Sequence, residues 1–289
     1  MVDTTCGLVR RHAACSPAHR VWPVAPTRDQ SVQVVDRRVE CKKGRLMKRA
    51  AELFAIDEWG LDSDFVEKAW TSHSEPEPAF ISIAASRWQI VVTTQRDVTQ
   101  LTVRGPETRA TVTPIPADAE FFGIVFSLGT FMPAIPLARL VDREVTLPAT
   151  TPRSAWFDGD RWEIPTPENT DVFVDHLVRQ GLLVRDPVAA ESLQVDVDSP
   201  SERTLQRRVA RATGLTRSTI RQIARAEKAV EALGQGLPPH AVATLLGYAD
   251  QAHLTRSLKR FIGQTATQIN HGGHWSIDSP VVPRSSRDR

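Results

Sequence analysis

The sequence predicts an α+β protein with a β-rich amino-terminal domain and an all-α domain in which two helix-turn-helix motifs are joined by a long helix. Three observations predict this: short β-prone runs in the first half, two copies of one amphipathic helix near the carboxyl end, and an unbroken helical pattern between them. A chain of 289 residues has room for about two such domains.

The β-rich domain is expected over 47–184. Turn residues separate its β-prone runs, which favours a small, mostly antiparallel sheet or barrel. The runs lie at 80–84, 88–93, 101–103, 110–112 and 121–126. A helix is then expected over 169–183, with Val172, Phe173, Leu177 and Val178 facing inward. Asp186-Pro187 predicts the domain boundary, because the residue before a proline disfavours helix.

The helical domain is expected over 185–270 and contains the repeated helix, whose copies lie 49 positions apart. Ser201 and Asp250 are expected to cap the copies, and Gly214 and Gly263 to end them in the left-handed conformation. Each copy has one apolar stripe: Leu205, Val209 and Ala212 in the first, Leu254, Leu258 and Phe261 in the second. Arginines recur on the opposite side, with Arg207 matching Arg256 and Arg211 matching Arg260. Each helix is therefore expected to be buried on one side and cationic on the other.

The segment between the copies reads as a helical strut over 217–233, about 25 Å long. Its apolar positions are Ile220, Ile223, Ala226, Val230 and Leu233. The other side carries Arg217, Arg221, Arg225 and Lys228. This side is interpreted as a solvated charged face, and phosphate contacts by one or two of its arginines are the alternative.

Residues 237–250 predict a complete helix-turn-helix together with the second copy. Pro238 and Pro239 suit a first helical turn, and Ala243 allows close helix crossing. Gly247 makes the tight turn, Tyr248 packs beneath it, and Asp250 opens the next helix. The predicted buried stripe consists of Val242, Leu245 and Leu246.

This ordered set resembles the AraC/XylS-type transcriptional regulators, whose DNA-binding module has two helix-turn-helices joined by a long helix. The resemblance covers about 187–270 and is most specific at 204–208, 213–215, 247–251, 254–256, 259–261 and Gly263. Two departures occur. Residues 193–198 alternate like a strand, so that only 187–194 are expected to be helical before the first copy, and Thr265-Ala266 replaces a usual threonine-proline. Residues 80–88 and 104–109 are weakly similar to a sensor-like domain found ahead of such modules.

The resemblance implies base-reading side chains at Arg203, Gln206 and Arg207 in the first copy and at Gln251, Ala252 and Arg256 in the second. Arginine can bond guanine bidentately, glutamine can do so to adenine, and alanine can touch a thymine methyl. Phosphate contacts, which position without reading sequence, are assigned to Thr204, Arg211, Thr255, Lys259 and Arg260. His253, beside the second cap, is expected to pack or bond locally rather than read a base.

The charge distribution supports this division of roles. Lys and Arg minus Asp and Glu give +5 over 1–46, −11 over 47–200, +7 over 201–270 and +1 over 271–289. A basic module beside an acidic one is the electrostatic pattern of nucleic-acid binding. Double-stranded DNA is thus the expected partner, with a small-molecule effector, a second copy of the chain and RNA polymerase as further candidates. The chain has no run of 18 apolar residues, so no membrane partner and a cytoplasmic location are expected.

The ends of the chain are expected to be tails: a disordered basic one over 1–46, with Met47 opening the compact part, and a flexible one over 271–289. Cys6, His12, Cys15 and His19 match no standard zinc spacing, so no metal and no cofactor are expected.

An enzyme in the β-rich domain is the main alternative from another class. No nucleophile motif, phosphate-binding loop or histidine-rich metal site stands out, so the protein is not expected to be an enzyme. Asp158, Asp160 and Glu163 between Trp156 and Trp162 could be paired acids, but a solvated acidic turn beside buried tryptophans is favoured. The tryptophans leave open an aromatic ligand pocket or a dimer surface. A regulator that depends on a protein partner, with a degenerate first helix-turn-helix, is the other alternative.

Overall fold

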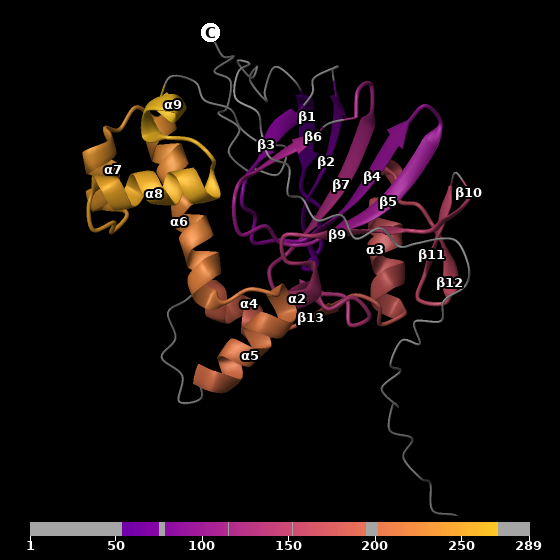
Figure 1. Cartoon of the computed structure of the whole chain (residues 1–289). Coiled ribbons are helices and arrows are strands. Elements are labelled where there is room, and N and C mark those ends of the chain that lie inside the picture. The colour runs from indigo at the N-terminus through magenta and orange to yellow at the C-terminus, as the bar shows by residue number, and fades with distance from the viewer. Residues whose placement is uncertain (1–53, 75–78, 115, 152, 195–201, 271–289) are drawn as a thin grey trace, which may run out of the picture. The chain divides into compact units, whose positions relative to one another are not determined.

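The computed structural model describes residues 54–74, 79–114, 116–151, 153–194 and 202–270 (Figure 1). The predictions for both tails, the three cysteines, Met47 and the cap at Ser201 therefore lie outside the described residues.

The amino-terminal region is built on a six-stranded antiparallel sheet with strand order β1-β2-β7-β4-β5-β9. Its strands are β1 (Phe54–Trp59), β2 (Val66–Ser74), β4 (Gln89–Gln95), β5 (Val98–Arg104), β7 (Glu120–Phe126) and β9 (Glu144–Leu147). One face carries Trp70, whose indole donates to the Gln89 side chain over 3.1 Å and crosses Gly123 on the neighbouring strand. A Cβ at Gly123 would overlap that indole, so the sequence needs a glycine there.

The other face of the sheet forms the main core of this region, with Ile90, Val92, Phe122 and Ile124 buried. Trp88 stacks on Phe126 with ring centroids 4.0 Å apart. Smaller units complete the region: a β3–β6 pair, a β10-β11-β12 sheet and a β8–β13 pair. Their bounds are β3 (Ala79–Ser82), β6 (Thr111–Pro114), β8 (Thr130–Phe131), β10 (Ala149–Thr151), β11 (Ser154–Phe157), β12 (Asp160–Glu163) and β13 (Val184–Arg185). The helical segments are α2 (Leu137–Leu140), η1 (Pro167–Asn169) and α3 (Thr170–Arg179).

The β-rich character expected of this region is confirmed, and each of the five predicted runs overlaps a strand, although the run at 80–84 extends two residues beyond β3. The prediction that Val172 faces inward is wrong, since it is 66% exposed, while Phe173 and Leu177 of the same helix are buried. Trp162 is buried as expected, but Trp156, on the other strand of the hairpin, is 47% exposed. Neighbouring residues on a strand face opposite sides, and Trp156 lies between the buried Ala155 and Phe157.

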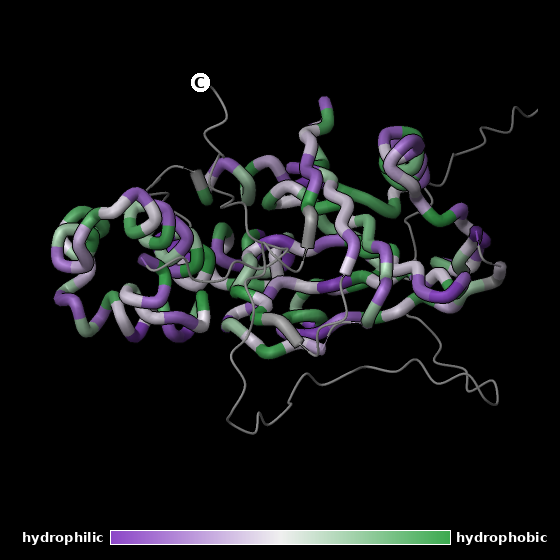
Figure 2. Tube along the Cα trace, turned by 90° about the horizontal axis from the view of Figure 1, so that it is seen from above, coloured by the Kyte–Doolittle hydropathy of each residue, from purple (hydrophilic) through white to green (hydrophobic). Residues whose placement is uncertain are grey.

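The carboxyl-terminal region is helical. It comprises α4 (Pro187–Gln194), α5 (Glu202–Thr213), α6 (Arg217–Gly234), α7 (Pro239–Leu245), α8 (Gln251–Phe261) and α9 (Ala266–Asn270). Figure 2 shows apolar and polar residues alternating along these helices, as expected of helices with one buried side. All apolar positions predicted for the two repeated helices and for the strut are buried. Gly214 and Gly263 have φ of 73° and 79°, which confirms the predicted left-handed helix ends.

Backbone hydrogen bonds join the second repeated helix to the β-rich region. The Ala84 N–H donates to the Phe261 carbonyl over 2.7 Å, and the Ala110 N–H donates to the Arg260 carbonyl over 2.8 Å. The last carbonyls of a helix lack partners within the helix, so these amides satisfy acceptors that α8 cannot satisfy itself. The first repeated helix meets the β-rich region at Gly214, whose Cα lies close to the backbone of Leu137.

Candidate nucleic-acid interface

The first helix pair, α4 and α5, is held together by Asp186. Its carboxylate accepts a hydrogen bond of 3.0 Å from the Ala189 N–H in the first turn of α4. The same carboxylate accepts two bonds from the Arg208 guanidinium of α5, at 2.9 and 2.7 Å. The Arg208 hydrogen bond lowers the pKa of Asp186 against the opposing effect of burial. The charged form of Asp186 therefore ties the start of α4 to the middle of α5.

The second helix pair, α7 and α8, follows the predicted pattern. Pro239 begins α7, and Gly247 makes the turn with φ of 68°. Asp250 caps α8, since its carboxylate accepts a 2.5 Å bond from the His253 N–H. Tyr248 is buried under the turn, and its hydroxyl lies 3.3 Å from the Ser257 hydroxyl of α8. The α8 helix is thereby fixed to the turn at both its first and second turns.

One residue of this pair departs from the prediction. Leu245 is 65% exposed, whereas Val242 and Ala243 are buried. The 3.6-residue period puts Leu245 three positions after Val242, but α7 is short and ends there, so the last turn has no neighbour to cover it. The assignment of Leu245 to the buried stripe is therefore wrong.

The long helix α6 joins the two pairs (Figure 1). It begins at the Thr216 cap, whose side chain accepts from the Thr219 N–H over 3.1 Å. At its start it contacts α4 and α5, and along its later turns it contacts α7, α8 and α9. The strut predicted over 217–233 is thus present with its buried stripe as expected.

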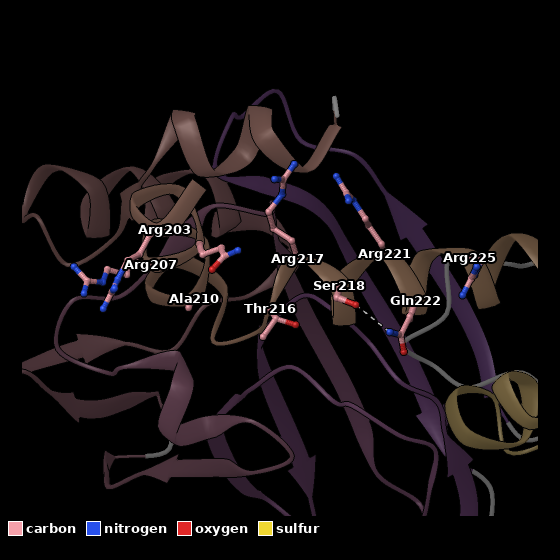
Figure 3. A pocket seen from close by; sticks show the side chains of 10 residues that line it. Arg203, Arg207, Ala210, Thr216, Arg217, Ser218, Arg221, Gln222 and Arg225 are labelled. Carbon is pink, nitrogen blue, oxygen red and sulfur yellow. Dashed lines mark hydrogen bonds between the residues drawn. The ribbon is translucent and has the colours of Figure 1, made fainter. Parts of the chain in front are cut away.

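The predicted base-reading residues are all exposed: Arg203, Gln206, Arg207, Gln251, Ala252 and Arg256. Those of α5 line a groove of about 900 Å³ that continues along α6 past Thr216, Arg217 and Arg221 (Figure 3). Those of α8 lie in its first two turns, beginning at the capped end. The structure therefore brings together the three predicted base-reading residues of α5, and likewise the three of α8, and leaves them accessible to a large partner.

The residues predicted to contact phosphate have more varied surroundings. Thr204, Lys259 and Arg260 are exposed, and the Arg260 guanidinium lies 4.8 Å from the Phe261 ring centroid. The Thr255 hydroxyl donates to the Gln251 carbonyl over 2.9 Å. Arg211 places its guanidinium 5.4 Å from the ring centroid of Phe131 in β8, a cation–π distance. Arg211 thus has a contact within the protein that the sequence did not indicate.

The charged side of α6 is only partly a solvated face. Arg221 and Lys228 are exposed, as expected. Arg217, however, donates to the Ser192 carbonyl over 2.8 Å, and the Arg225 guanidinium lies 4.4 Å from the Tyr248 ring centroid. Sequence reasoning missed both contacts because all three arginines share one helical stripe and nothing in that pattern separates them.

His253 makes local contacts, as the sequence indicated. Its Nδ1 accepts from the Ala249 N–H over 3.4 Å, and its ring meets the edge of Tyr248 with centroids 5.2 Å apart. The histidine therefore packs between the turn and the first turn of α8.

Residues 199–271 match a family described as a helix-turn-helix domain. The carboxyl-terminal module is an AraC/XylS-type helix-turn-helix domain. No curated protein and no solved structure matches the chain. The match supports DNA binding by this module and assigns no family to the amino-terminal β-rich region.

The β-rich region ahead of the AraC-type module contains the acidic hairpin and a groove that bear on the alternative sites. Asp158, Asp160 and Glu163 are exposed on the β11–β12 hairpin, in agreement with a solvated acidic turn. Among the described residues, no group of three or more His, Cys, Asp or Glu side chains could hold a metal ion. A groove of about 570 Å³ lies over β2 and β7, with Phe122 and Val92 among its lining residues. No helix within the described ranges is long and apolar enough to cross a bilayer.

Proposed function

We propose that this protein is a sequence-specific transcription regulator in which both helix pairs are helix-turn-helix motifs that read one DNA duplex. The observation that supports this proposal is the arrangement of two helices, α5 and α8, each buried on one side, at the two ends of α6. Both present arginine and glutamine side chains to solvent. These side chains can bond guanine and adenine in the major groove.

In this proposal Arg203, Gln206 and Arg207 read one groove segment, and Gln251, Ala252 and Arg256 read the next. Thr204, Thr255, Lys259 and Arg260 would bind phosphates, which adds affinity without sequence preference. Arg211 is a weaker candidate for phosphate binding than its sequence position implies, because its guanidinium already lies over Phe131. The net charge of +7 over 201–270 supports attraction to DNA.

The β-rich region would sense an effector, pair two copies, or contact the transcription machinery. The two hydrogen bonds from Ala84 and Ala110 to the end of α8 support a role in which the β-rich region acts on α8, the second of the two proposed DNA-reading helices.

Selection of bound sites from a random pool of duplexes, using the full chain, tests the proposal. The expected result is a consensus with two conserved segments about one helical turn apart, roughly 34 Å. A footprint on the selected site should then show protection on two successive major-groove faces. Recovery of no consensus would reject sequence-specific binding, and a single protected face would favour a regulator that depends on a protein partner.

A further inference from the structure

The groove between α5 and α6 contains a row of three arginines, Arg217, Arg221 and Arg225, spaced four residues apart on α6 (Figure 3). Four residues bring a side chain back to nearly the same side of a helix. The first and last of these arginines lie about 12 Å apart along the helix axis. The three share a residue type and a side of α6, but they have different neighbours.

Arg217 is bound to the first helix pair. Its Nη2 donates to the Ser192 carbonyl over 2.8 Å, and Ser192 lies in the last turn of α4. Carbonyls of a last turn lack partners within their helix and carry the negative end of the helix dipole. A guanidinium therefore suits that position in both hydrogen bonding and charge. The Arg217 Nε is buried and has no hydrogen-bond partner among the described residues, so burial of this side chain depends on the Ser192 bond.

Arg225 is bound to the second helix pair. Its guanidinium lies 4.4 Å from the ring centroid of Tyr248, and its Nη1 approaches the Gly247 carbonyl at 3.4 Å. Both partners belong to the turn between α7 and α8. A planar guanidinium can stack on an aromatic ring and donate sideways at once, which an ammonium cannot do.

The partner of each arginine in turn contacts one of the two proposed DNA-reading helices, α5 and α8, which are called the reader helices. Tyr248 reaches α8 through the Ser257 hydroxyl at 3.3 Å and through the ring of His253. The α4 helix reaches α5 through the bonds between Asp186 and Arg208 at 2.9 and 2.7 Å. Both readers are thus connected to α6 by an arginine and one intermediate element.

We infer that Arg217 and Arg225 are positioning residues that hold the two reader helices at one spacing and one angle, so that the protein measures the distance between its two DNA segments. This inference rests on the proposed function, because spacing has meaning only if both helix pairs bind the same duplex. An insertion of one base pair moves the second segment by about 3.4 Å and rotates it by roughly 34°, which a rigid pair of readers cannot follow.

The test measures affinity of the full chain for the selected duplex and for duplexes with one or two base pairs inserted between the two conserved segments. The wild-type protein should lose about tenfold or more in affinity on insertion, as expected if one reader is displaced. Arg225→Gln should reduce that loss to about threefold or less, since the second reader can then adjust. Arg217→Gln should act in the same direction.

Lys228→Gln is the matched control, because it removes one positive charge from an exposed position on the same helix. It should lower affinity for all duplexes alike and keep the wild-type response to insertion. Arg225→Lys keeps the charge but cannot both stack and donate, so it should reduce the spacing response even if Arg225→Gln does not fold. Thermal unfolding of each variant separates folding from positioning.

Two negative outcomes can be told apart. If the wild type has a spacing preference and Arg217→Gln, Arg225→Gln and Arg225→Lys all keep it, the positioning role is wrong and the proposed function stands. If the wild type selects no two-part site, the proposed function fails and the inference fails with it.

Discussion

At the scale of single residues, the two arginines on the exposed side of α8 illustrate the difference between reading and attraction. Arg256 lies in the second turn after the Asp250 cap, and Arg260 lies at the end of the helix beside Phe261. Residues near the start of a recognition helix reach base edges, whereas later ones lie nearer the backbone. Truncation of Arg256 and truncation of Arg260 should therefore change DNA binding in different ways.

Arg256→Ala should weaken binding to the selected duplex by about 1–3 kcal/mol and change binding to a scrambled duplex little, as expected for loss of a bidentate guanine contact. Arg260→Ala should weaken both duplexes alike and lower the slope of log affinity against log salt by about one. Titrations of both variants at several salt concentrations measure this. Equal loss on both duplexes for Arg256→Ala would show that it acts only through charge.

Asp186 should make the stability of the folded protein depend on pH. Its carboxylate is held charged by Arg208, so its pKa is lowered in the folded state. A lowered carboxyl pKa gives stability that is fully present above the unfolded value, near pH 4, and is lost as the pH falls through the folded value. Asp186→Asn, which can still cap α4, should cost about 1 kcal/mol at pH 7 and progressively less below pH 4.

Thermal unfolding from pH 7 to pH 2 measures the difference between Asp186→Asn and wild type. Asp175→Asn provides the control, because Asp175 also pairs with an arginine but both side chains of that pair are more than 60% exposed. It should change stability little at any pH. A constant difference for Asp186→Asn across this range would mean that the charge of Asp186 does not stabilise the fold.

At the scale of elements, α6 shows what a sequence pattern can and cannot predict. Its bounds and buried stripe follow from the 3.6-residue period, because Ile220, Ile223 and Val230 must share one side of any helix over this segment. The roles of Arg217 and Arg225 could not be predicted, since they depend on a carbonyl and a ring contributed by distant parts of the chain. Helix faces are local properties, whereas side-chain partners are set by tertiary packing.

The same helix, α6, carries Glu227, whose charged form is disfavoured by burial. Burial raises the pKa of Glu227, with Arg87 and Lys68 opposing the shift and Glu67 and Glu231 adding to it. Arg87 is itself ion-paired to Glu67, and Lys68 is paired to Glu58 at 2.6 Å. A carboxyl with a raised pKa costs stability above that pKa, and the cost disappears as the pH falls below the ordinary glutamate value, about 4.3.

Glu227→Gln should therefore raise Tm at pH 7 by about 2 °C or more, and the gain should vanish below about pH 4. Differential scanning calorimetry at both pH values measures it. Glu231→Gln, at an exposed position one turn later, should raise Tm less. A lower Tm for Glu227→Gln at pH 7 would show that its charge is compensated by the nearby arginine and lysine.

At the scale of the whole molecule, the β-rich region was harder to predict than the helices. The predicted runs at 88–93 and 121–126 are rich in apolar and β-branched residues and became the central strands β4 and β7. Strands β1 and β2 were missed because exposed charged residues interrupt their apolar positions, as in Asp57 and Glu58. Of these two strands only β1 lies at an edge of the sheet, and both obtain their pairing from other segments of the chain, so their own sequence predicts them weakly.

The candidate site was predictable to a different extent. Recurring motifs placed Arg203, Arg207 and Arg256 on the exposed sides of α5 and α8, where the structure has them. The contact of Arg211 with Phe131 was not predictable, because Phe131 belongs to a two-residue strand 80 positions earlier. Which of these side chains contact bases remains a prediction.

The contact between the β-rich region and α5 should be measurable through glycine substitutions. Gly214 and Gly247 both have positive φ, at 73° and 68°, so alanine costs about 1–2 kcal/mol of backbone strain at either. A Cβ at Gly214 would also lie 2.8 Å from the Leu137 backbone, whereas none of the described residues has an atom within 4 Å of a Cβ at Gly247. Gly214→Ala should therefore lower Tm more than Gly247→Ala, as thermal unfolding can show. Equal losses would mean that Leu137 moves aside freely.

The predicted tail gives a further test on the full chain. A chain that starts at Met47 should bind the selected duplex within tenfold of the full-length protein at physiological salt, about 1.4 kcal/mol. Binding titrations of the two proteins decide this. A greater loss would place part of the DNA contact in residues 1–46.

The bonds from Ala84 and Ala110 to the end of α8 bear on how this reader could be transplanted. A fragment cut at Asp186-Pro187 would keep every helix of the module, yet it would leave the carbonyls of Arg260 and Phe261 without their protein donors. Water can replace such donors at an exposed helix end, but it does not hold the last turn in place, and that turn also carries Lys259 and Arg260. A chimera that grafts this module onto another sensor should therefore supply two backbone amides at the same place. The DNA-reading module therefore depends on two short stretches of chain, around Ala84 and Ala110, that lie more than 70 residues before its first helix.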